Sequence, residues 1–198
     1  MEAYAFGKKT FQMEDYDSDG SWYEIAPWRK KYEKQIKSVV VCYGMSSIGD
    51  FAFLECEKLR SIVLPNSVTS FGQSAFYGCR SLESVVIPDS VTSIDDNAFE
   101  SCKALESITI PNSVDSIGES TFDDCTSLVS VVIPNSVTSI GNSAFDSCTS
   151  LESVLIPDTV TSIGNSAFSS CKKMNEFSIP SSVVSLGCNP FAGCEQLR

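Results

Sequence analysis

The cysteines are the residues of this 198-residue chain whose type and spacing most suggest chemistry. Nine are present, and seven of them recur with a 23-residue period: Cys56, Cys79, Cys102, Cys125, Cys148, Cys171 and Cys194. Cysteine can form disulfides, bind metals or act as a nucleophile. The chain has no histidine and no two cysteines separated by two residues, so the sequence predicts neither a zinc site nor a Cys–His nucleophile.

Disulfides within the periodic set are also disfavoured by geometry. Stacked β rungs would hold successive cysteines about 4.8 Å apart, whereas a disulfide needs Cβ atoms about 3.8 Å apart. A free cysteine behaves as a small core hydrophobe. We therefore predict a buried column of free thiols. Cys42 and Cys188 lie outside this column and are better candidates for reactive thiols.

Paired acidic residues are the other candidates for catalysis. Asp95 and Asp96 form one pair, and Asp123 and Asp124 form another at the equivalent place in a later repeat. Two carboxylates can hydrolyse glycosides when they face each other across a cleft, but adjacent residues point apart. The glycines are single turn residues and form no phosphate-binding loop. We predict no catalytic residue, no metal and no cofactor, and hence a protein that is not an enzyme.

Proline and phenylalanine recur with the same 23-residue period. These residues are Pro65, Pro88, Pro111, Pro134, Pro157 and Pro180, and also Phe53, Phe76, Phe99, Phe122, Phe145, Phe168 and Phe191. A fixed period in this size range is typical of a solenoid. An apolar content of 42% argues against a disordered repeat.

One repeat, LESVVIPDSVTSIDDNAFESCKA from Leu82, shows the expected unit. Its LxxVxI segment predicts a short strand with alternate side chains inward, ended by Pro88. The spacing of the following apolar residues is helix-like, so we expect a short helix or 3₁₀ turn around NAFESC. The predicted fold is an α/β solenoid with a parallel sheet. Helical returns are bulkier than strands, so the sheet is expected to be concave.

The chain divides into an expected N-terminal cap, residues 1–37, and a solenoid of about seven units, residues 38–198, the last incomplete. Both tryptophans lie in the cap, and Trp28, Tyr32 and Ile36 form one face of a predicted basic amphipathic helix. This helix could instead bind a membrane or a partner. The sequence stops at CEQLR, where Leu197 would open another strand. We expect either a piece of a longer protein or an end that stacks on another chain, which would give end-to-end self-association.

The net charge of −11 comes entirely from the repeats. Residues 1–37 carry seven acidic and seven basic side chains, whereas residues 38–198 carry eighteen and seven. This excess argues against nucleic acid and anionic lipid as partners, and it also serves solubility. No segment has the length and hydrophobicity of a membrane span or a signal peptide.

The outward side of the predicted strands is the remaining candidate surface. One column consists of Ser61, Ser84, Ser107, Ser130, Ser153 and Glu176, and beside it lie Val63, Val86, Thr109, Val132, Leu155 and Ser178. Exposed apolar residues often mark contact sites, although β-branched residues also simply favour strands. The face covers only about 300–400 Å² by strand spacing, against about 800 Å² for a standard interface. Neighbouring turns must contribute, or binding is weak and multivalent.

The motif IGNSAFDSCTSLESVLIPDTV at 140–160, with copies from residue 48 onward, resembles the BspA-like (Treponema-type) leucine-rich repeat. MEDY at 13–16, APW at 26–28 and VVV at 39–41 resemble the cap of that family. The resemblance implies a right-handed solenoid and a cell-surface or secreted protein that adheres to host proteins. Cys42, Met45 and Cys188 depart from the motif.

The sequence therefore predicts an adhesin-like module that binds a protein through the concave face. One alternative is an intracellular, cytoplasmic interaction scaffold of the same fold, which the free thiols and missing signal sequence favour. Another is an ice- or crystal-surface binder that uses Thr69, Thr92, Thr138 and Thr161, although Asp115 and Val184 interrupt that ladder.

Overall fold

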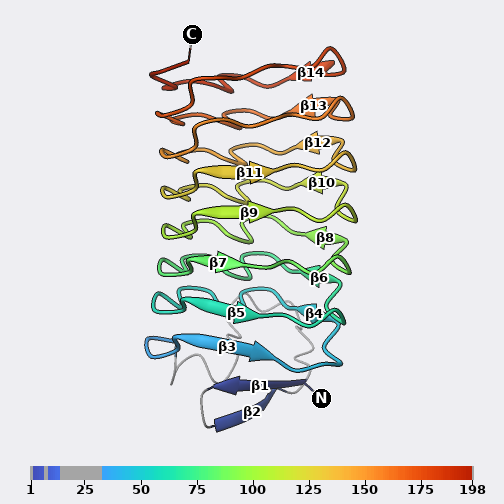
Figure 1. Ribbon diagram of the computed structural model, residues 1–198, viewed down its shortest axis with the longest axis vertical. Coiled ribbons are helices and arrows are strands. Elements are labelled where there is room, and N and C mark those ends of the chain that lie inside the picture. Colours follow the sequence, from blue (N-terminus) through green and yellow to red (C-terminus); the bar gives the residue numbers. More distant parts are fainter. Residues whose placement is uncertain (1, 7–8, 14–32, 198) are drawn as a thin grey trace.

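The computed structural model describes residues 2–6, 9–13 and 33–197. The chain winds into rungs that stack along one long axis, with the N-terminal strands at one end and β14 at the other (Figure 1). Two columns of short parallel strands run along the stack. The predicted parallel solenoid is confirmed.

The first column follows the LxxVxI segment of each repeat. It contains β3 (Ser38–Val41), β5 (Ser61–Val63), β7 (Ser84–Val85), β9 (Ser107–Thr109) and β11 (Ser130–Val132). Partners in the parallel register are one repeat apart, as in Ser38 with Ser61, and isolated bridges extend the column to Ser153 and Glu176. Serine is exposed and the next residue is buried on each of these strands. This alternation leaves one side of the column facing solvent.

The second column follows the turn after proline. It contains β4 (Ser47–Ile48), β6 (Ser70–Phe71), β8 (Ser93–Ile94), β10 (Ser116–Ile117), β12 (Ser139–Ile140), β13 (Ser162–Ile163) and β14 (Ser185–Leu186). Six repeats lead from Ser47 to Ser185, so the described solenoid makes about six turns. Strand pairing in this column is interrupted between β8 and β10.

The prediction of a helix or 3₁₀ turn around NAFESC is wrong, since the described residues contain no helix. Asn97 and Ser101 have φ angles of 60° and 58°, in the left-handed region that a right-handed helix cannot contain. Phe99 donates its backbone N–H to the carbonyl of Thr121 on the next rung, at 2.9 Å, instead of to a residue four positions earlier. The return is therefore a series of turns bonded between rungs.

The returns are stacked by the same rung-to-rung backbone bonds as the strands, so they are no thicker along the axis. The predicted concavity depended on bulky helical returns, and that reason no longer applies. In Figure 1 the rungs stack in a nearly straight column. We call the solvent-facing side of the first strand column the strand face.

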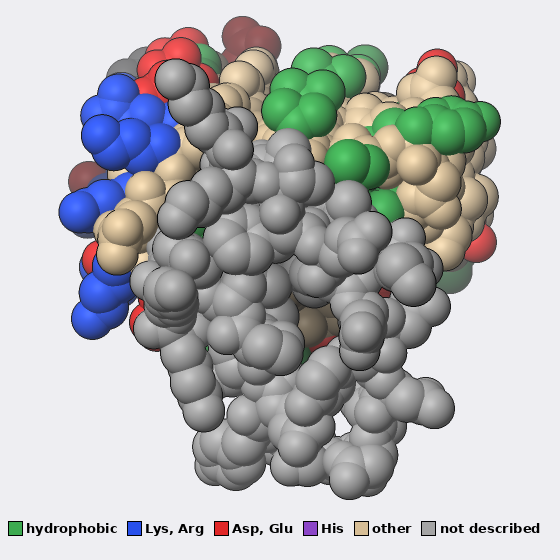
Figure 2. Space-filling model, turned by 90° about the horizontal axis from the view of Figure 1, so that it is seen from below, with side chains coloured by type: hydrophobic (Ala, Val, Ile, Leu, Met, Phe, Trp, Pro, Cys, Tyr) green, Lys and Arg blue, Asp and Glu red, His purple; other side chains and the backbone are tan. Residues whose placement is uncertain are grey.

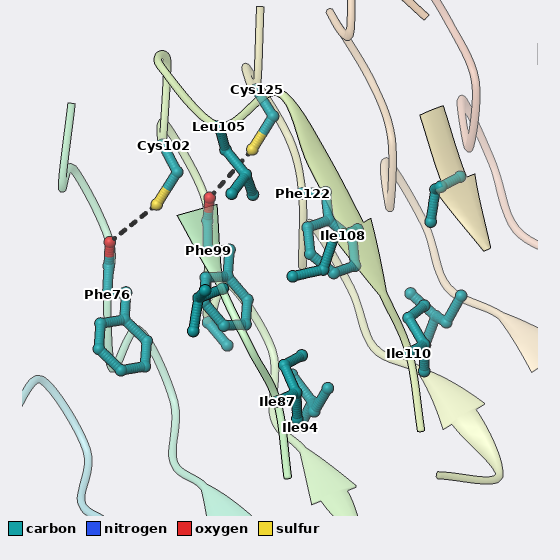
Figure 3. Close-up of a cluster of buried hydrophobic side chains, with 14 of the residues drawn as sticks. Phe76, Ile87, Ile94, Phe99, Cys102, Leu105, Ile108, Ile110, Phe122 and Cys125 are labelled. Carbon is teal, nitrogen blue, oxygen red and sulfur yellow. Dashed lines mark hydrogen bonds between the residues drawn. The ribbon is translucent and has the colours of Figure 1, made fainter. Parts of the chain in front are cut away.

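Stacked phenylalanines form the centre of the core (Figure 3). Ring centroids of successive rungs lie 5.1–5.9 Å apart, with interplanar angles of 6–13°. The rings of the interior rungs are fully buried. Such aromatic pairs contribute about 0.5–1.5 kcal/mol each beyond area burial. The stack therefore couples each rung to its neighbours.

The periodic cysteines add a second tie between rungs. Cys102 Sγ donates to the carbonyl of Phe76 at 3.3 Å, and Cys125 Sγ donates to that of Phe99 at 3.2 Å (Figure 3). The same bond, at 3.1–3.2 Å, recurs from Cys79, Cys148, Cys171 and Cys194. Burial raises the pKa of the Cys102 and Cys125 thiols, which keeps them protonated and able to donate.

None of the nine cysteines, all of which the structure describes, is part of a disulfide. Six members of the periodic column are buried, and Cys194 on the last rung is half-buried. Outside the column, Cys42 is half-buried and Cys188 is exposed. The buried thiols thus act as core side chains that also satisfy a carbonyl.

An antiparallel hairpin precedes the solenoid. It consists of β1 (Glu2–Phe6) and β2 (Lys9–Met13), and β1 pairs antiparallel with β3, Tyr4 opposite Val41. The hairpin backbone therefore covers the outer edge of β3, which would otherwise expose unpaired backbone groups. Trp22, and Trp28 and Tyr32 of the predicted amphipathic helix, lie outside the described residues. The end of that segment is described: residues 33–35 form a turn, and Ile36 is buried. The assignment of residues 1–37 as a cap stays a prediction.

Candidate binding face

The strand face carries every residue predicted for it. All twelve are exposed: Ser61, Val63, Ser84, Val86, Ser107, Thr109, Ser130, Val132, Ser153, Leu155, Glu176 and Ser178. Val86 and Leu155 are each 82% exposed, although the residues before them, Val85 and Val154, are 7% exposed. The alternation of the strand thus places apolar side chains in solvent at regular intervals.

The first rung extends this face beyond the predicted set. Val40 on β3 is 49% exposed and pairs in register with Val63. Ser38 pairs with Ser61 in the same way. Both residues follow from the 23-residue period, since Ser38 and Val40 stand one repeat before Ser61 and Val63. We call Val40, Val63, Val86, Val132 and Leu155 the apolar stripe.

A third exposed column, which the sequence reasoning missed, lies directly before the serines. It consists of Lys37, Arg60, Glu83, Glu106, Val129, Glu152 and Asn175, and we call it the flank column. Each member donates its backbone N–H to the carbonyl of the member one rung earlier, at 2.8–3.4 Å from Arg60 to Asn175. The strand face is therefore continuous, even where β7 and β9 are not paired as strands.

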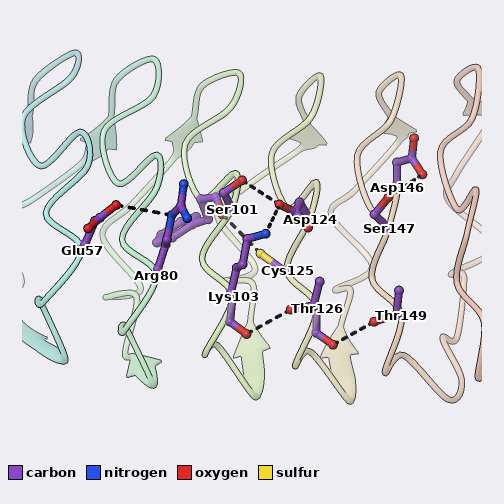
Figure 4. Close-up of polar contacts among 11 residues, drawn as sticks. Glu57, Arg80, Ser101, Lys103, Asp124, Cys125, Thr126, Asp146, Ser147 and Thr149 are labelled. Atoms are coloured by element: carbon purple, nitrogen blue, oxygen red, sulfur yellow. Dashed lines mark hydrogen bonds and ion pairs between the residues drawn. The ribbon is translucent and has the colours of Figure 1, made fainter.

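Polar contacts border the face at the turns that precede the flank column (Figure 4). Arg80 Nε lies 3.7 Å from Glu57 Oε1, and Lys103 Nζ lies 2.8 Å from Asp124 Oδ2. Ser101 Oγ also donates to Asp124, at 3.0 Å. These ion pairs are partly exposed and each contributes little to stability. Asp124 is thus part of an ion pair between rungs and does not face a second carboxylate across a cleft.

Its neighbour Asp123 stands in a column of like charges. Burial, together with Asp146 and Glu100 one rung to either side, raises the pKa of Asp123 to about 7. Burial also raises the pKa of Glu100. The folded chain therefore holds a proton on Asp123 at pH values where the unfolded chain has released it.

We expect Asp123→Asn to stabilise the protein above pH 7 by about 1 kcal/mol, after discounting for solvent screening. A raised carboxyl pKa makes the folded state bind more protons, so the wild type loses stability as pH rises from about 4 to 7. Melting temperatures from pH 4.5 to 8.5 test this, with the exposed Asp158→Asn as control. A wild-type melting temperature that rises across this window, or equal effects of the two variants, would contradict it.

The other acidic pair lies at the interruption between β8 and β10. Asp95 and Asp96 line an open recess of about 330 Å³ with Gln73, Ser116 and Gly118. Asp96 Oδ1 accepts the backbone N–H of Glu119 at 2.7 Å. Burial and the nearby carboxylates of Asp50 and Asp96 raise the pKa of Asp95. Within the described part of the chain, no cluster of three or more His, Cys, Asp or Glu side chains is arranged to hold a metal ion.

The threonines considered as an ice- or crystal-binding ladder are exposed, but their hydroxyls bond within the chain. Thr69, Thr92, Thr138 and Thr161 each donate Oγ1–H to the carbonyl one rung earlier, at 2.9–3.3 Å. Those hydrogens are not available to a surface ligand. This arrangement weakens the threonine alternative.

Comparison with known proteins places this geometry among leucine-rich repeats. The model for the BspA type leucine-rich repeat region matches residues 30–148 and 94–198, with six copies. No curated protein has a significant match to the chain.

Three solved structures are similar to it. A leucine-rich repeat protein of Treponema pallidum is 33% identical with a TM-score of 0.75, and the alignment covers 82% of this chain and 84% of that one. One from Bacteroides ovatus has the same identity and TM-score, over 78% of this chain and 40% of the other. A leucine-rich cell surface protein of Faecalibacterium prausnitzii is 32% identical with a TM-score of 0.59, over 82% and 38%. The chain therefore spans less than half of the last two proteins. Among the described residues there is no helix that could cross a membrane.

Proposed function

This chain belongs to the BspA type leucine-rich repeat family, and we propose that its strand face binds a protein partner. The observation that carries the proposal is the apolar stripe, in which Val86 and Leu155 are each 82% exposed. Exposed aliphatic side chains have an unfavourable free energy of hydration, and burial against a partner removes it. The rungs hold them in place, so binding requires little ordering of the chain.

The dimensions of the face suit a narrow contact. Seven rungs at about 4.8 Å extend over about 30 Å, and the exposed width of each strand is about three residues. The flank column and the turns that precede it widen this area. We infer a contact of moderate affinity, or one repeated along a longer stack.

We further propose an adhesin-like role at the cell surface. It is supported by the family and by the Faecalibacterium neighbour, which is described as a cell surface protein. The alternative is an intracellular scaffold, for which the free buried thiols are an argument. Labelling of intact cells with an impermeant biotin reagent distinguishes them, since only a surface protein is labelled before lysis.

A double substitution on the stripe, Val86→Arg with Val132→Arg, is expected to abolish partner capture while the fold is kept. Both side chains point into solvent, so arginine is accommodated at little cost to stability, whereas an apolar contact is lost and charge is introduced. The measurement is a pull-down with identification by mass spectrometry, with folding checked by circular dichroism. We expect at least a tenfold loss of each specific partner.

The matched control is Asn112→Arg with Asn135→Arg, which adds the same charge at exposed turns of neighbouring rungs. The control should retain the partner. A partner kept by the stripe variant, or lost equally by both variants, would refute the strand face as the site.

End-to-end self-association is a second candidate, favoured by the last rung. Ile179 is 43% exposed and Leu186 on β14 is 49% exposed, whereas their counterparts one rung earlier, Ile156 and Ile163, are 4% and 1% exposed. Among the described strands β14 pairs only with β13. Light scattering would show a dimer that Ile179→Lys with Leu186→Lys converts to monomer. A wild-type monomer at all concentrations would rule it out.

A further inference from the structure

The flank column carries an ordered charge pattern. Lys37 and Arg60 stand on the first two rungs, and Glu83, Glu106 and Glu152 follow on later rungs. Figure 2, which views the stack from its N-terminal end, shows Lys and Arg side chains gathered on one side of the described surface. The face therefore changes from basic to acidic along its length.

Within the described part of the chain, the charged side chains of the flank column form no ion pair. The ion pairs found there join Arg80 to Glu57, Lys103 to Asp124 and Lys172 to Glu195, and none involves the flank column. Lys37 and Arg60 are bonded neighbours in the ladder, as are Glu83 and Glu106. Like charges opposite each other destabilise a sheet, and Debye screening over about 8 Å does not remove the repulsion at this spacing. A partner of opposite pattern would relieve it.

Short side chains separate the two rows of longer ones on this face. Ser61, Ser84, Ser107, Ser130 and Ser153 are exposed and stand in the sequence between the flank column and the apolar stripe. Members of the two rows on one rung are three residues, or about 10 Å of extended chain, apart. An α-helix with its side chains is about 10–12 Å across. A helix lying along the stack over the serines is therefore wide enough to reach both rows.

The repeat along the stack also suits a helix. One helical turn rises about 5.4 Å, about 0.6 Å more than the rung spacing of about 4.8 Å, so one side chain per turn stays within one rung of its partner along the whole stack. An extended strand presents same-side residues about 6.6 Å apart and loses register within three rungs. The spacing selects the helix.

Resting on the function proposed above, we propose that the occupant of the strand face is an amphipathic helix of a partner protein, about 20 residues long. Apolar residues of the helix, one per turn, lie on the apolar stripe, which Thr109 interrupts on one rung. Basic residues on the adjoining side of the helix meet Glu83, Glu106 and Glu152, and acidic residues at one end meet Lys37 and Arg60. The charges fix which end of the helix lies at the first rung.

The test uses three fluorescein-labelled synthetic peptides of the length proposed for the helix, each with leucine once per turn on an alanine-rich background. The matched peptide carries lysine beside the leucines along four turns and glutamate on the last two. The inverted peptide exchanges lysine and glutamate, and the neutral peptide carries glutamine. Binding to the full chain is measured by fluorescence anisotropy at low and at high salt, about 0.05 and 0.5 M, which bracket the range over which screening acts.

We expect the matched peptide to bind at least tenfold more tightly than the inverted peptide at low salt, with the difference collapsing at high salt. The variant Glu83→Lys with Glu106→Lys and Glu152→Lys should reverse this preference. The peptide should gain helical circular dichroism on binding. Val86→Arg with Val132→Arg should weaken binding of the matched and the neutral peptide.

Equal binding of the three peptides would overturn the inference about charge and leave the strand face as a binding site. Absence of binding by every peptide would overturn the helical occupant. The proposed function fails separately, when a natural partner is kept by the Val86→Arg with Val132→Arg variant. The two failures are therefore distinguishable.

Discussion

Replacing Phe122 by alanine is expected to lower the free energy of unfolding by about 3–5 kcal/mol. The ring is fully buried and stacks between Phe99, at 5.6 Å, and Phe145, at 5.3 Å. Its removal leaves a cavity in the middle of the column and breaks two stacking contacts. Neighbouring rungs cannot move together to fill the cavity, because backbone hydrogen bonds between the returns fix their spacing. One of these bonds runs from Phe122 N–H to the carbonyl of Ala144.

The measurement is urea unfolding followed by circular dichroism, and the control is Phe191→Ala. Phe191 occupies the same place on the last rung but is only partly buried and stacks on Phe168 at 5.9 Å. We expect Phe191→Ala to lower the free energy of unfolding by less than half as much as Phe122→Ala. In a solenoid each rung contacts only its neighbours, so an interior loss also divides the stack into two weakly coupled parts. Equal costs at the two positions would show that the ring column does not couple the rungs.

Replacing Gly141 by alanine is expected to destabilise the protein by about 1–3 kcal/mol through overpacking. A Cβ built at this residue would lie 2.6 Å from the carbonyl carbon of Gly118 and 2.8 Å from the nitrogen of Glu119. Both atoms belong to the backbone of the rung before and cannot swing aside. The rungs would have to separate, which weakens the bond from Gly141 N–H to the carbonyl of Ile117, now 2.8 Å.

Gly49 provides the matched control, because it occupies the same place on the first rung and a Cβ there would meet nothing within 4 Å. Gly49→Ala should leave the melting temperature within about 1 °C, or raise it slightly by restricting the unfolded chain. One repeat of the chain has a residue other than glycine at this position. Asp95 stands where Gly72 and Gly118 stand on adjacent rungs, and strand pairing between β8 and β10 is interrupted there. A Gly141→Ala protein as stable as the wild type would refute the close-contact explanation.

The sequence alone determined the stacking and its register. Because every repeat has the same length, equivalent residues must stack in one column. The type of residue in each column decides whether that column faces the core or the solvent. Phe99, Cys102 and Ile108 are apolar in every equivalent place and are buried, whereas Ser107 is polar and is exposed. Alternation in a strand is a local property, so the exposed stripe could be predicted as well.

Only the tertiary structure decided the conformation of the returns and the extent of the face. Ala98, Phe99 and Cys102 have a spacing that a helix and a series of turns both satisfy. The choice depends on where the backbone N–H groups find acceptors. The neighbouring rung supplies them, as Asp123 does for Ser101 at 2.7 Å, and the left-handed residues make that approach possible. The flank column likewise became part of the face only once bonds between rungs had aligned it beside the serines.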